Sequence, residues 1–146
     1  MLKFYKMNNL VQAPVKATEG SACFDIHAWL EKPILVPARR GVRLVPTGLI
    51  LDIPEGHSVR LHPRSGLAIK HGITLINAEG VIDSDYVNEL MVPLINFGPM
   101  AFQVTPGMRI CQAELVETLR YTCTETVIKP TQKTTRDGGF GSTGTS

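Results

Sequence analysis

The sequence lacks any long apolar run and any strong excess of charge. Its apolar runs are short and are interrupted by proline or charge, far below the roughly 20 residues of a membrane-spanning helix. The first residues have no apolar segment of the kind found in secretory signals. The formal charge is only +2 at pH 7, so neither nucleic acid nor a membrane is expected as a partner. We therefore expect a cytoplasmic protein, acting in the host cytoplasm if its source is viral.

Cysteine and histidine are too few and too widely spaced to form a recognisable disulfide or metal motif. Cys23, Cys111 and Cys123 are an odd number without C-x-x-C spacing, which is typical of reduced packing thiols. The histidines never pair with a cysteine or with one another at zinc-like spacing, and the H-x-E and P-C-x-x-C signature of zinc nucleobase deaminases is absent. A metal, if the protein uses one, is expected to arrive on a ligand.

Short alternating segments are the main structural signal. In residues 58–62, Val59 and Leu61 share one face and polar side chains share the other, which is typical of a half-buried strand. Such segments recur between ten prolines and thirteen glycines, so the sequence predicts an all-β, distorted jelly-roll or β-barrel-like single domain. At most a short helix is expected after Ser65. The predicted strands are residues 2–6, 23–29, 47–53, 58–62, 73–77, 90–95, 109–116 and 121–128.

The alternating pattern stops near residue 130. Residues 130–146 contain four glycines, five threonines and one large apolar side chain, which favours a mobile arm over a strand. We therefore divide the chain into a β domain over residues 1–129 and a flexible C-terminal arm over residues 130–146 that carries a glycine-rich motif.

Two connections hold residues suited to chemistry. In residues 62–73, the guanidinium of Arg64, the hydroxyl of Ser65 and the amides of Ser65 and Gly66 suit phosphate oxygens, although Pro-Arg-Ser-Gly alone is a common turn. Residues 77–89 are interpreted as a hairpin whose connection holds Gly80, Asp83, Asp85 and Tyr86. Side chains alternate along extended chain, so one of the two carboxylates could point inward at a water molecule. Acidic residues are also common in turns, however, because their side chains accept hydrogen bonds from nearby backbone amides.

Three more positions are candidates on weaker grounds. Gln112 lies in a predicted strand, where a lone glutamine usually faces solvent. Asp25 stands between Phe24 and Ile26, where a strand disfavours aspartate unless it has a partner, such as a structural arginine. In the arm, glycines around Phe140 permit close approach to a ligand, so that its ring could stack on a planar base, with hydroxyls nearby for phosphate.

Together these stretches resemble the trimeric dUTP pyrophosphatase (dUTPase) family over essentially the full chain. The matching motifs are A-x-x-G-S-A-x-x-D at residues 17–25, P-R-S-G-L-A at 63–68, G-V-I-D-S-D-Y at 80–86, G-x-R-I-x-Q at 107–112 and G-G-F-G-S-T-G at 138–144. The resemblance implies hydrolysis of dUTP to dUMP and pyrophosphate by water attack on the α-phosphorus. This reaction removes dUTP from the nucleotide pool and supplies dUMP for dTMP synthesis.

The resemblance also implies a role for each site residue. Asp83 orients and deprotonates the attacking water, and Mg²⁺ is bound mainly through the substrate phosphates, with Asp25 reaching it only through water. The residues implied in substrate binding are Arg64, Ser65, Gly66, Asn77, Gly80, Tyr86, Gln112, Arg136, Phe140, Gly141, Ser142 and Thr143. Among them Asn77 and the hairpin backbone pair with uracil, Tyr86 packs on deoxyribose, and Phe140 of the closing arm stacks on the base.

Homotrimers with active sites at subunit interfaces are implied as well. The chain departs from the family pattern in three respects: Val87 and Asn88 replace an arginine and a glycine, Cys23 replaces a glycine, and Arg136 stands four rather than five residues before Phe140. The alternatives are a related dCTP deaminase, a catalytically inactive nucleotide sensor, and a structural jelly-roll protein without nucleotide affinity.

Overall fold

The computed structural model describes residues 1–135, in which a four-stranded sheet faces a five-stranded sheet. The four-stranded sheet has the order β1-β5-β9-β7, the five-stranded sheet has the order β2-β3-β11-β6-β8, and β10 pairs with β4. In chain order the elements are β1 (Lys3–Lys6), β2 (Val15–Lys16), β3 (Phe24–His27), β4 (Ile34–Val36), β5 (Gly41–Asp52), β6 (His57–His62), α1 (Ser65–His71), β7 (Ile73–Leu75), β8 (Gly80–Ile82), β9 (Glu89–Asn96), β10 (Phe102–Val104) and β11 (Arg109–Glu117).

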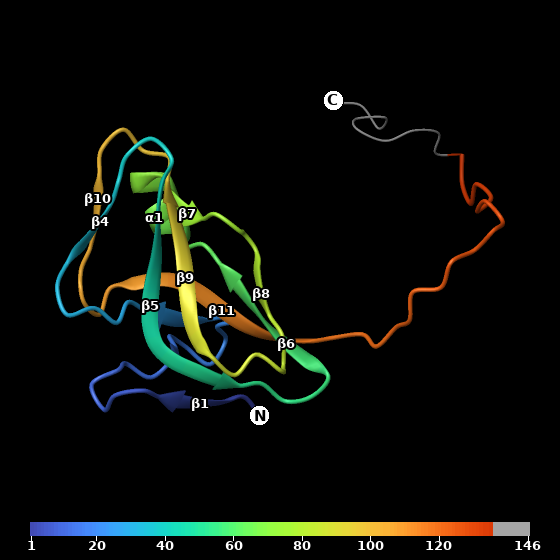
Figure 1. Cartoon of the computed structure of the whole chain (residues 1–146), viewed down its shortest axis with the longest axis horizontal. Coiled ribbons are helices and arrows are strands. Elements are labelled where there is room, and N and C mark those ends of the chain that lie inside the picture. The colour runs from blue at the N-terminus through green and yellow to red at the C-terminus, as the bar shows by residue number, and fades with distance from the viewer. Residues whose placement is uncertain (136–146) are drawn as a thin grey trace.

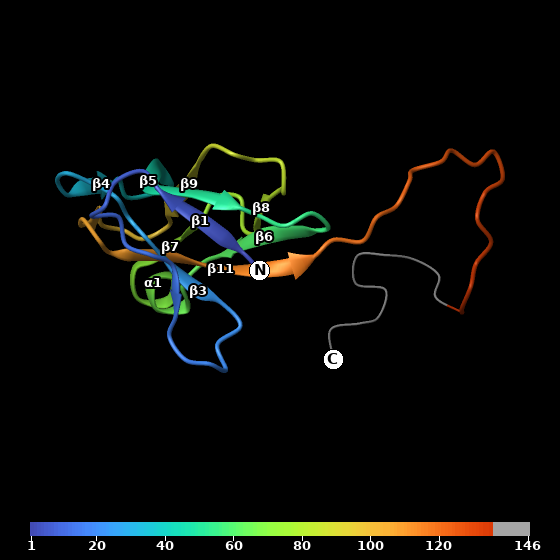
Figure 2. The ribbon, with the colours of Figure 1, turned by 90° about the horizontal axis from the view of Figure 1, so that it is seen from below.

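The core lies between the two larger sheets. In Figure 2, β5 and β9 lie above β3 and β11, and buried aliphatic side chains from both layers form one cluster. Val45 and Val92 contribute from the upper sheet, and Ile26, Val59 and Ala113 contribute from the lower sheet. The predicted all-β jelly-roll class is confirmed.

A bend in β5 lets one strand serve two neighbours. Its first part pairs with β9 and its last part with β1, and the register against β9 shifts between Pro46 and Ile50. Gly48 lies in this bulge with φ +67, where a Cβ would approach Val11 Cγ2 to 2.5 Å. Because only glycine takes this conformation without strain, the glycine at this position allows the bulge to form.

Helix α1 joins β6 to β7 and is the short helix expected after Ser65. It ends at Gly72, whose φ of 69 and bond from its N–H to the Ala68 carbonyl form a left-handed C-cap. None of its residues is buried. In the described part of the chain, no helix is long and apolar enough to cross a membrane.

Most predicted strands are confirmed within a few residues, but two expectations are wrong. Residues 121–128 form no strand: the chain leaves the end of β11 and runs away from the sheets (Figure 1), with Tyr121 80% and Val127 97% exposed. Strand-favouring side chains alone do not make a strand when no ladder partner is beside them. The expected hairpin over 77–89 is also wrong, because β8 pairs with β6 and the chain then turns into β9 of the other sheet.

Candidate functional site

Three adjacent strands place polar side chains in one row on the five-stranded sheet. Strand β11 lies between β3 and β6, and Gln112 stands opposite Asp25 on one side and opposite His62 on the other. Residues directly opposite one another in a sheet point to the same face. Asp25, Gln112 and His62 therefore share a face, although Gln112 is 87 residues from Asp25 and 50 residues from His62 along the chain.

Asp25 is the buried centre of this row. Only 8% of the residue is exposed, and its carboxylate lies between two guanidinium groups: Arg64 Nε is 3.3 Å from Oδ1, and Arg109 Nη1 donates to Oδ2 at 3.1 Å. Arg64 also donates to the Arg109 carbonyl at 3.2 Å. The contact to Oδ1 is an ion pair without hydrogen-bond geometry, so this buried oxygen accepts no hydrogen bond from the described residues. An unfilled acceptor of this kind suits a water molecule.

Arg64, Ser65 and Gly66 lie where β6 gives way to α1. Arg64 has extended backbone angles and accepts the first helical bonds, from the amides of Leu67 and Ala68, through its carbonyl. The amides of Ser65 and Gly66 precede those bonds and therefore have no partner within the helix. The predicted phosphate-binding turn is thus located beside Asp25, reached by the side chain of Arg64.

Arg109 is a site residue that sequence reasoning missed. It belongs to the G-x-R-I-x-Q motif, but only the glutamine of that motif, Gln112, was predicted to be a site residue. The signal was present, because a strand aspartate needs a cationic partner and the structure supplies two rather than one. A register shift in β11 between Arg109 and Cys111 turns this arginine towards the carboxylate.

Burial sets the protonation of two groups around the row. It lowers the pKa of His27 below its ordinary value, with Arg109 and Arg64 acting in the same direction and Asp25 opposing. His27 is therefore neutral at pH 7. Burial raises the pKa of the Cys111 thiol to about 12, so this cysteine is a packing group and no nucleophile.

Residues 77–89 form a second group of predicted site residues. A Cβ on Gly80 would lie 3.2 Å from Asn77 Nδ2 and 3.3 Å from Leu61 Cβ, so glycine allows the two segments to meet closely. The hydroxyl of Tyr86 donates to the Glu89 carbonyl at 2.9 Å, and its amide donates to the Asp83 carbonyl at 3.2 Å. These two bonds fix the turn that follows β8.

Asp83 is exposed and faces open space. A pocket of about 400 Å³ is lined by Asp83, Ser84 and Asp85 together with residues 55–57, Thr118 and Arg120. Of the three carboxylates on the wall of this pocket, Glu55 is paired with Arg120, and Asp83 and Asp85 provide candidate general bases. The pocket contains neither Asp25 nor Arg64 among its lining residues.

The two groups of site residues do not meet within one chain. Ile82 stands opposite Val59, so Asp83 follows level with Ser58, at the far end of β6 from Arg64. Six residues of extended chain span about 20 Å. The structure therefore brings Asp25, Arg64 and Gln112 together and leaves Asp83 near the opposite end of β6.

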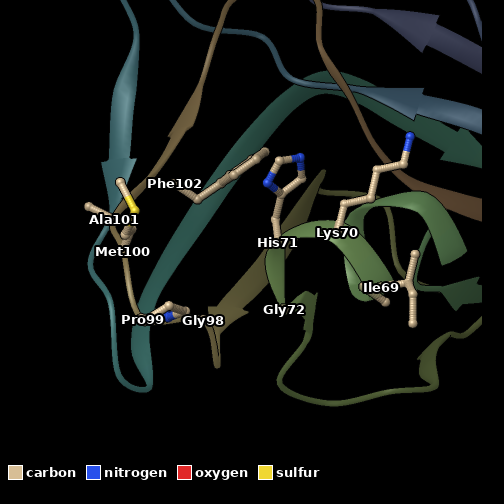
Figure 3. A pocket seen from close by; sticks show the side chains of 10 residues that line it. Ile69, Lys70, His71, Gly72, Gly98, Pro99, Met100, Ala101 and Phe102 are labelled. Atoms are coloured by element: carbon tan, nitrogen blue, oxygen red, sulfur yellow. The ribbon is translucent and has the colours of Figure 1, made fainter.

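A second cavity is separate from both groups. It has a volume of about 440 Å³ and lies between the end of α1 and the loop before β10, and the rings of His71 and Phe102 in its wall are 5.0 Å apart. Figure 3 shows the side chains that line it. Its lining includes Ile69 and Met100. None of the predicted site residues lines it.

The remaining predicted site residues are Arg136, Phe140, Gly141, Ser142 and Thr143. They lie outside the described residues, as does most of the predicted arm.

Comparison with known proteins places these features in one family. A family model for dUTPase matches residues 9–144. The chain is 42% identical over 147 aligned positions to a deoxyuridine 5′-triphosphate nucleotidohydrolase of Chlamydia pneumoniae, covering 100% of both chains. It is 47% identical over 135 positions to the protein of that name from Brucella melitensis biotype 2, covering 90% of this chain and 84% of the relative.

Solved structures agree on the fold. A mutant dUTPase of Staphylococcus bacteriophage 80alpha, determined with dUpNHpp, matches with a TM-score of 0.85 at 17% identity and 99% coverage of both chains. A mutant dUTPase of phage phi11 of S. aureus, described for its coordination of a structural Mg(II) ion, matches with a TM-score of 0.77 at 15% identity over 90% of this chain and 99% of that one.

Proposed function

The chain belongs to the dUTPase family and hydrolyses dUTP to dUMP and pyrophosphate, and we propose that the phosphate cluster of one copy (Arg64, Ser65, Gly66 and Gln112) works with Asp83 of another copy. One observation carries this proposal: Gln112 lies opposite Asp25, and the guanidinium of Arg64 contacts the Asp25 carboxylate. Hydrogen-bond donors for a triphosphate are thus gathered around one buried carboxylate.

The phosphate-binding part consists of Arg64, Ser65, Gly66 and Gln112. Their guanidinium, hydroxyl, amide and carboxamide groups all donate hydrogen bonds, which suits the acceptor oxygens of phosphates. Charge that gathers on these oxygens during the reaction is stabilised by donors that are already in place, and this is usually the largest contribution to such catalysis. Asp25 holds Arg64 in position before the nucleotide arrives.

The residues around Asp25 fit a magnesium ion carried on the nucleotide. Mg²⁺ prefers oxygen ligands and keeps several waters, and the buried Asp25 Oδ1 is an acceptor without a hydrogen bond from the described residues. Asp25 would thus hold the ion through water, while the substrate phosphates bind it directly. When bound, the ion supplies positive charge to the phosphate oxygens.

Asp83 acts as the general base. Its carboxylate orients a water molecule and takes its proton as the oxygen bonds to the α-phosphorus. The bond from that phosphorus to the oxygen bridging to the β-phosphate breaks, and pyrophosphate leaves. A positioned base of this kind contributes about 10²- to 10⁴-fold. Asp85, which lines the same pocket, has no role in this step.

Uracil is selected by the segment around β8. Asn77 and the backbone near Gly80 pair with the base, and Tyr86 packs on deoxyribose. The bond from the Tyr86 hydroxyl to the Glu89 carbonyl supports this assignment, because it holds the ring in a fixed place. Hydrogen-bonding sites reject substrates that lack the matching group by about 10⁴- to 10⁵-fold.

The active site is assembled from several copies of the chain. Asp83 and Arg64 lie about 20 Å apart along β6, too far to act on the same nucleotide within one copy. This separation supports the homotrimer with sites at its interfaces. Phe140 stacks on uracil, and Arg136, Gly141, Ser142 and Thr143 contact the phosphates when the arm over residues 130–146 closes on the β domain over residues 1–129.

We place the reaction in the cytoplasm of the source or of its host. The three cysteines are free, with Cys123 exposed, which fits a reducing compartment.

The proposed function is tested by measuring pyrophosphate release from dUTP, UTP, dCTP and dTTP with Mg²⁺ and with excess EDTA. We expect release from dUTP alone and only with the metal. Asp83→Asn should slow turnover about 10²- to 10⁴-fold while dUTP still binds, whereas Asp85→Asn should leave turnover near the original rate. Equal losses in both variants, or none in Asp83→Asn, would remove Asp83 from the role of base.

A further inference from the structure

A second polar row lies directly beside the phosphate-binding row on the same sheet face. Glu114 is two residues beyond Gln112 on β11, so its side chain points to the face that carries Gln112, and Cys23 lies just before β3. One ligand atom each from Cys23, His62 and Glu114 lies within 4.8 Å of the other two. We propose that these three side chains bind a divalent transition metal such as Zn²⁺.

The ligand set matches the chemistry of zinc. Thiolate, imidazole and carboxylate are its usual protein ligands, and three of them leave a fourth position for water. Bond lengths of about 2.0–2.3 Å put tetrahedral ligand atoms roughly 3.3–3.7 Å apart. His62 Nε2 and Glu114 Oε1 are already 3.0 Å apart, and the 4.8 Å limit leaves the thiol only a small movement to close the site.

A carboxylate also lies near the ring nitrogen of His62 that faces away from Glu114, where metal-binding histidines usually have an outer partner. This nitrogen, Nδ1, is 3.8 Å from Glu79 Oε2, and Arg60 Nη1 holds that carboxylate by a 2.6 Å bond to Oε1. This distance is too long for a hydrogen bond, and the proposal requires a small shift of the ring or of Glu79 that lets the carboxylate accept from Nδ1 and leaves Nε2 free to bind a metal. The hydrogen bond between His62 and Glu114 explains two of the groups, but it does not account for the thiol of Cys23 beside them.

This site differs in kind from the magnesium site of the reaction. A thiolate favours zinc or cobalt over the hard magnesium ion, which takes oxygen ligands. The three ligands come from the residue just before β3, from β6 and from β11, so a bound ion joins three neighbouring segments next to Gln112. None of them was assigned to phosphate, base or sugar. A metal ion bound here would therefore hold these three segments together beside the proposed catalytic residues.

Cobalt(II) titration of the full chain without nucleotide tests the proposal, because Co²⁺ bound to thiolate gives a charge-transfer band in the near ultraviolet. We expect one equivalent per chain and visible bands of tetrahedral Co²⁺, with Zn²⁺ displacing it and millimolar Mg²⁺ leaving it in place. Cys23→Ser should remove the charge-transfer band. Glu79→Gln should weaken binding about 10- to 100-fold, as loss of an outer partner does elsewhere.

Cys123→Ser is the matched control, since this exposed cysteine is far from the site in sequence and should leave the band unchanged. Circular dichroism of each variant separates lost ligands from lost folding, and the absorption readout is independent of dUTP turnover. The proposal is overturned if no charge-transfer band forms at one equivalent in the original chain. It is equally overturned if the band survives in folded Cys23→Ser, or if Mg²⁺ abolishes it.

Discussion

Replacing Asp25 with asparagine keeps the size of the side chain but removes the charge between two arginines. The Asp25 side chain is only 10% exposed, and its contacts are 3.3 Å to Arg64 Nε and 3.1 Å to Arg109 Nη1. Without the carboxylate, two guanidinium groups face each other across a neutral amide. We expect Asp25→Asn to destabilise the folded chain and to release Arg64 from its position beside the phosphate site.

The size of the effect follows from the exposure of each partner. The Arg109 side chain is 52% exposed, so its contact is screened and contributes about 0.5–1 kcal/mol. The Arg64 side chain is 26% exposed, and removing one partner of this largely desolvated ion pair leaves the guanidinium charge uncompensated, which costs about 1.5–3 kcal/mol, somewhat less than for a fully buried pair. The sum of about 2–4 kcal/mol corresponds to a drop in Tm of roughly 4–16 °C for a domain of this size.

Thermal unfolding followed by circular dichroism, at one fixed protein concentration and without nucleotide, measures this drop. Asp52→Asn is the control, because its contact to Lys3 is 3.9 Å long and both side chains are more than 70% exposed, at 73% and 72%. It should change stability by less than about 0.5 kcal/mol. Equal Tm values for the two variants would refute the claim that the Asp25 carboxylate organises the cluster.

Two further predictions concern stability. Burial lowers the pKa of His27 in the folded chain, so the unfolded chain binds the extra proton first. The contribution of His27 to stability is fully present above the unfolded pKa of about 6.5 and is lost as the pH drops through the folded pKa. His27→Gln should therefore flatten the dependence of Tm on pH below about 6.5. An unchanged slope would contradict this assignment. Gly72→Ala places a Cβ 2.7 Å from the Gly98 amide nitrogen at φ +69 and should cost about 1–3 kcal/mol in urea unfolding, whereas Gly20→Ala, with nothing within 4 Å, should cost little.

The sequence predicted strands best where side chains alternate, and worst where pairing depends on distant segments. Residues 58–62 and 109–116 correspond closely to β6 and β11, because one face of each is buried. Residues 121–128 have strand-forming side chains and nevertheless form no strand, since a strand also needs a partner. The partner of β8 is likewise non-local, and no turn signal near residue 80 reveals that β6 is the neighbour.

The sequence motifs selected candidate site residues but did not reveal how these residues are arranged. The motifs selected Asp25, Arg64 and Gln112, which the sheet register brings together. They did not reveal that Arg109 is the second partner of Asp25, because that contact depends on a register shift in β11. The grouping of Cys23 with two distant side chains was missed for the same reason, since search by spacing finds only metal ligands that are close in sequence.

The assembly of the site from two copies is tested most directly by mixing two inactive variants. In the proposed site, Arg64→Ala removes a phosphate-binding group and Asp83→Asn removes the general base, so each variant alone should have little dUTP turnover. When both are co-expressed in equal amounts, about a quarter of the interfaces combine an intact cluster with an intact base, being one half times one half for a ring of copies. Turnover should then rise to roughly a quarter of the original rate. Activity no greater than the average of the two variants would place the whole site within one chain and contradict the account.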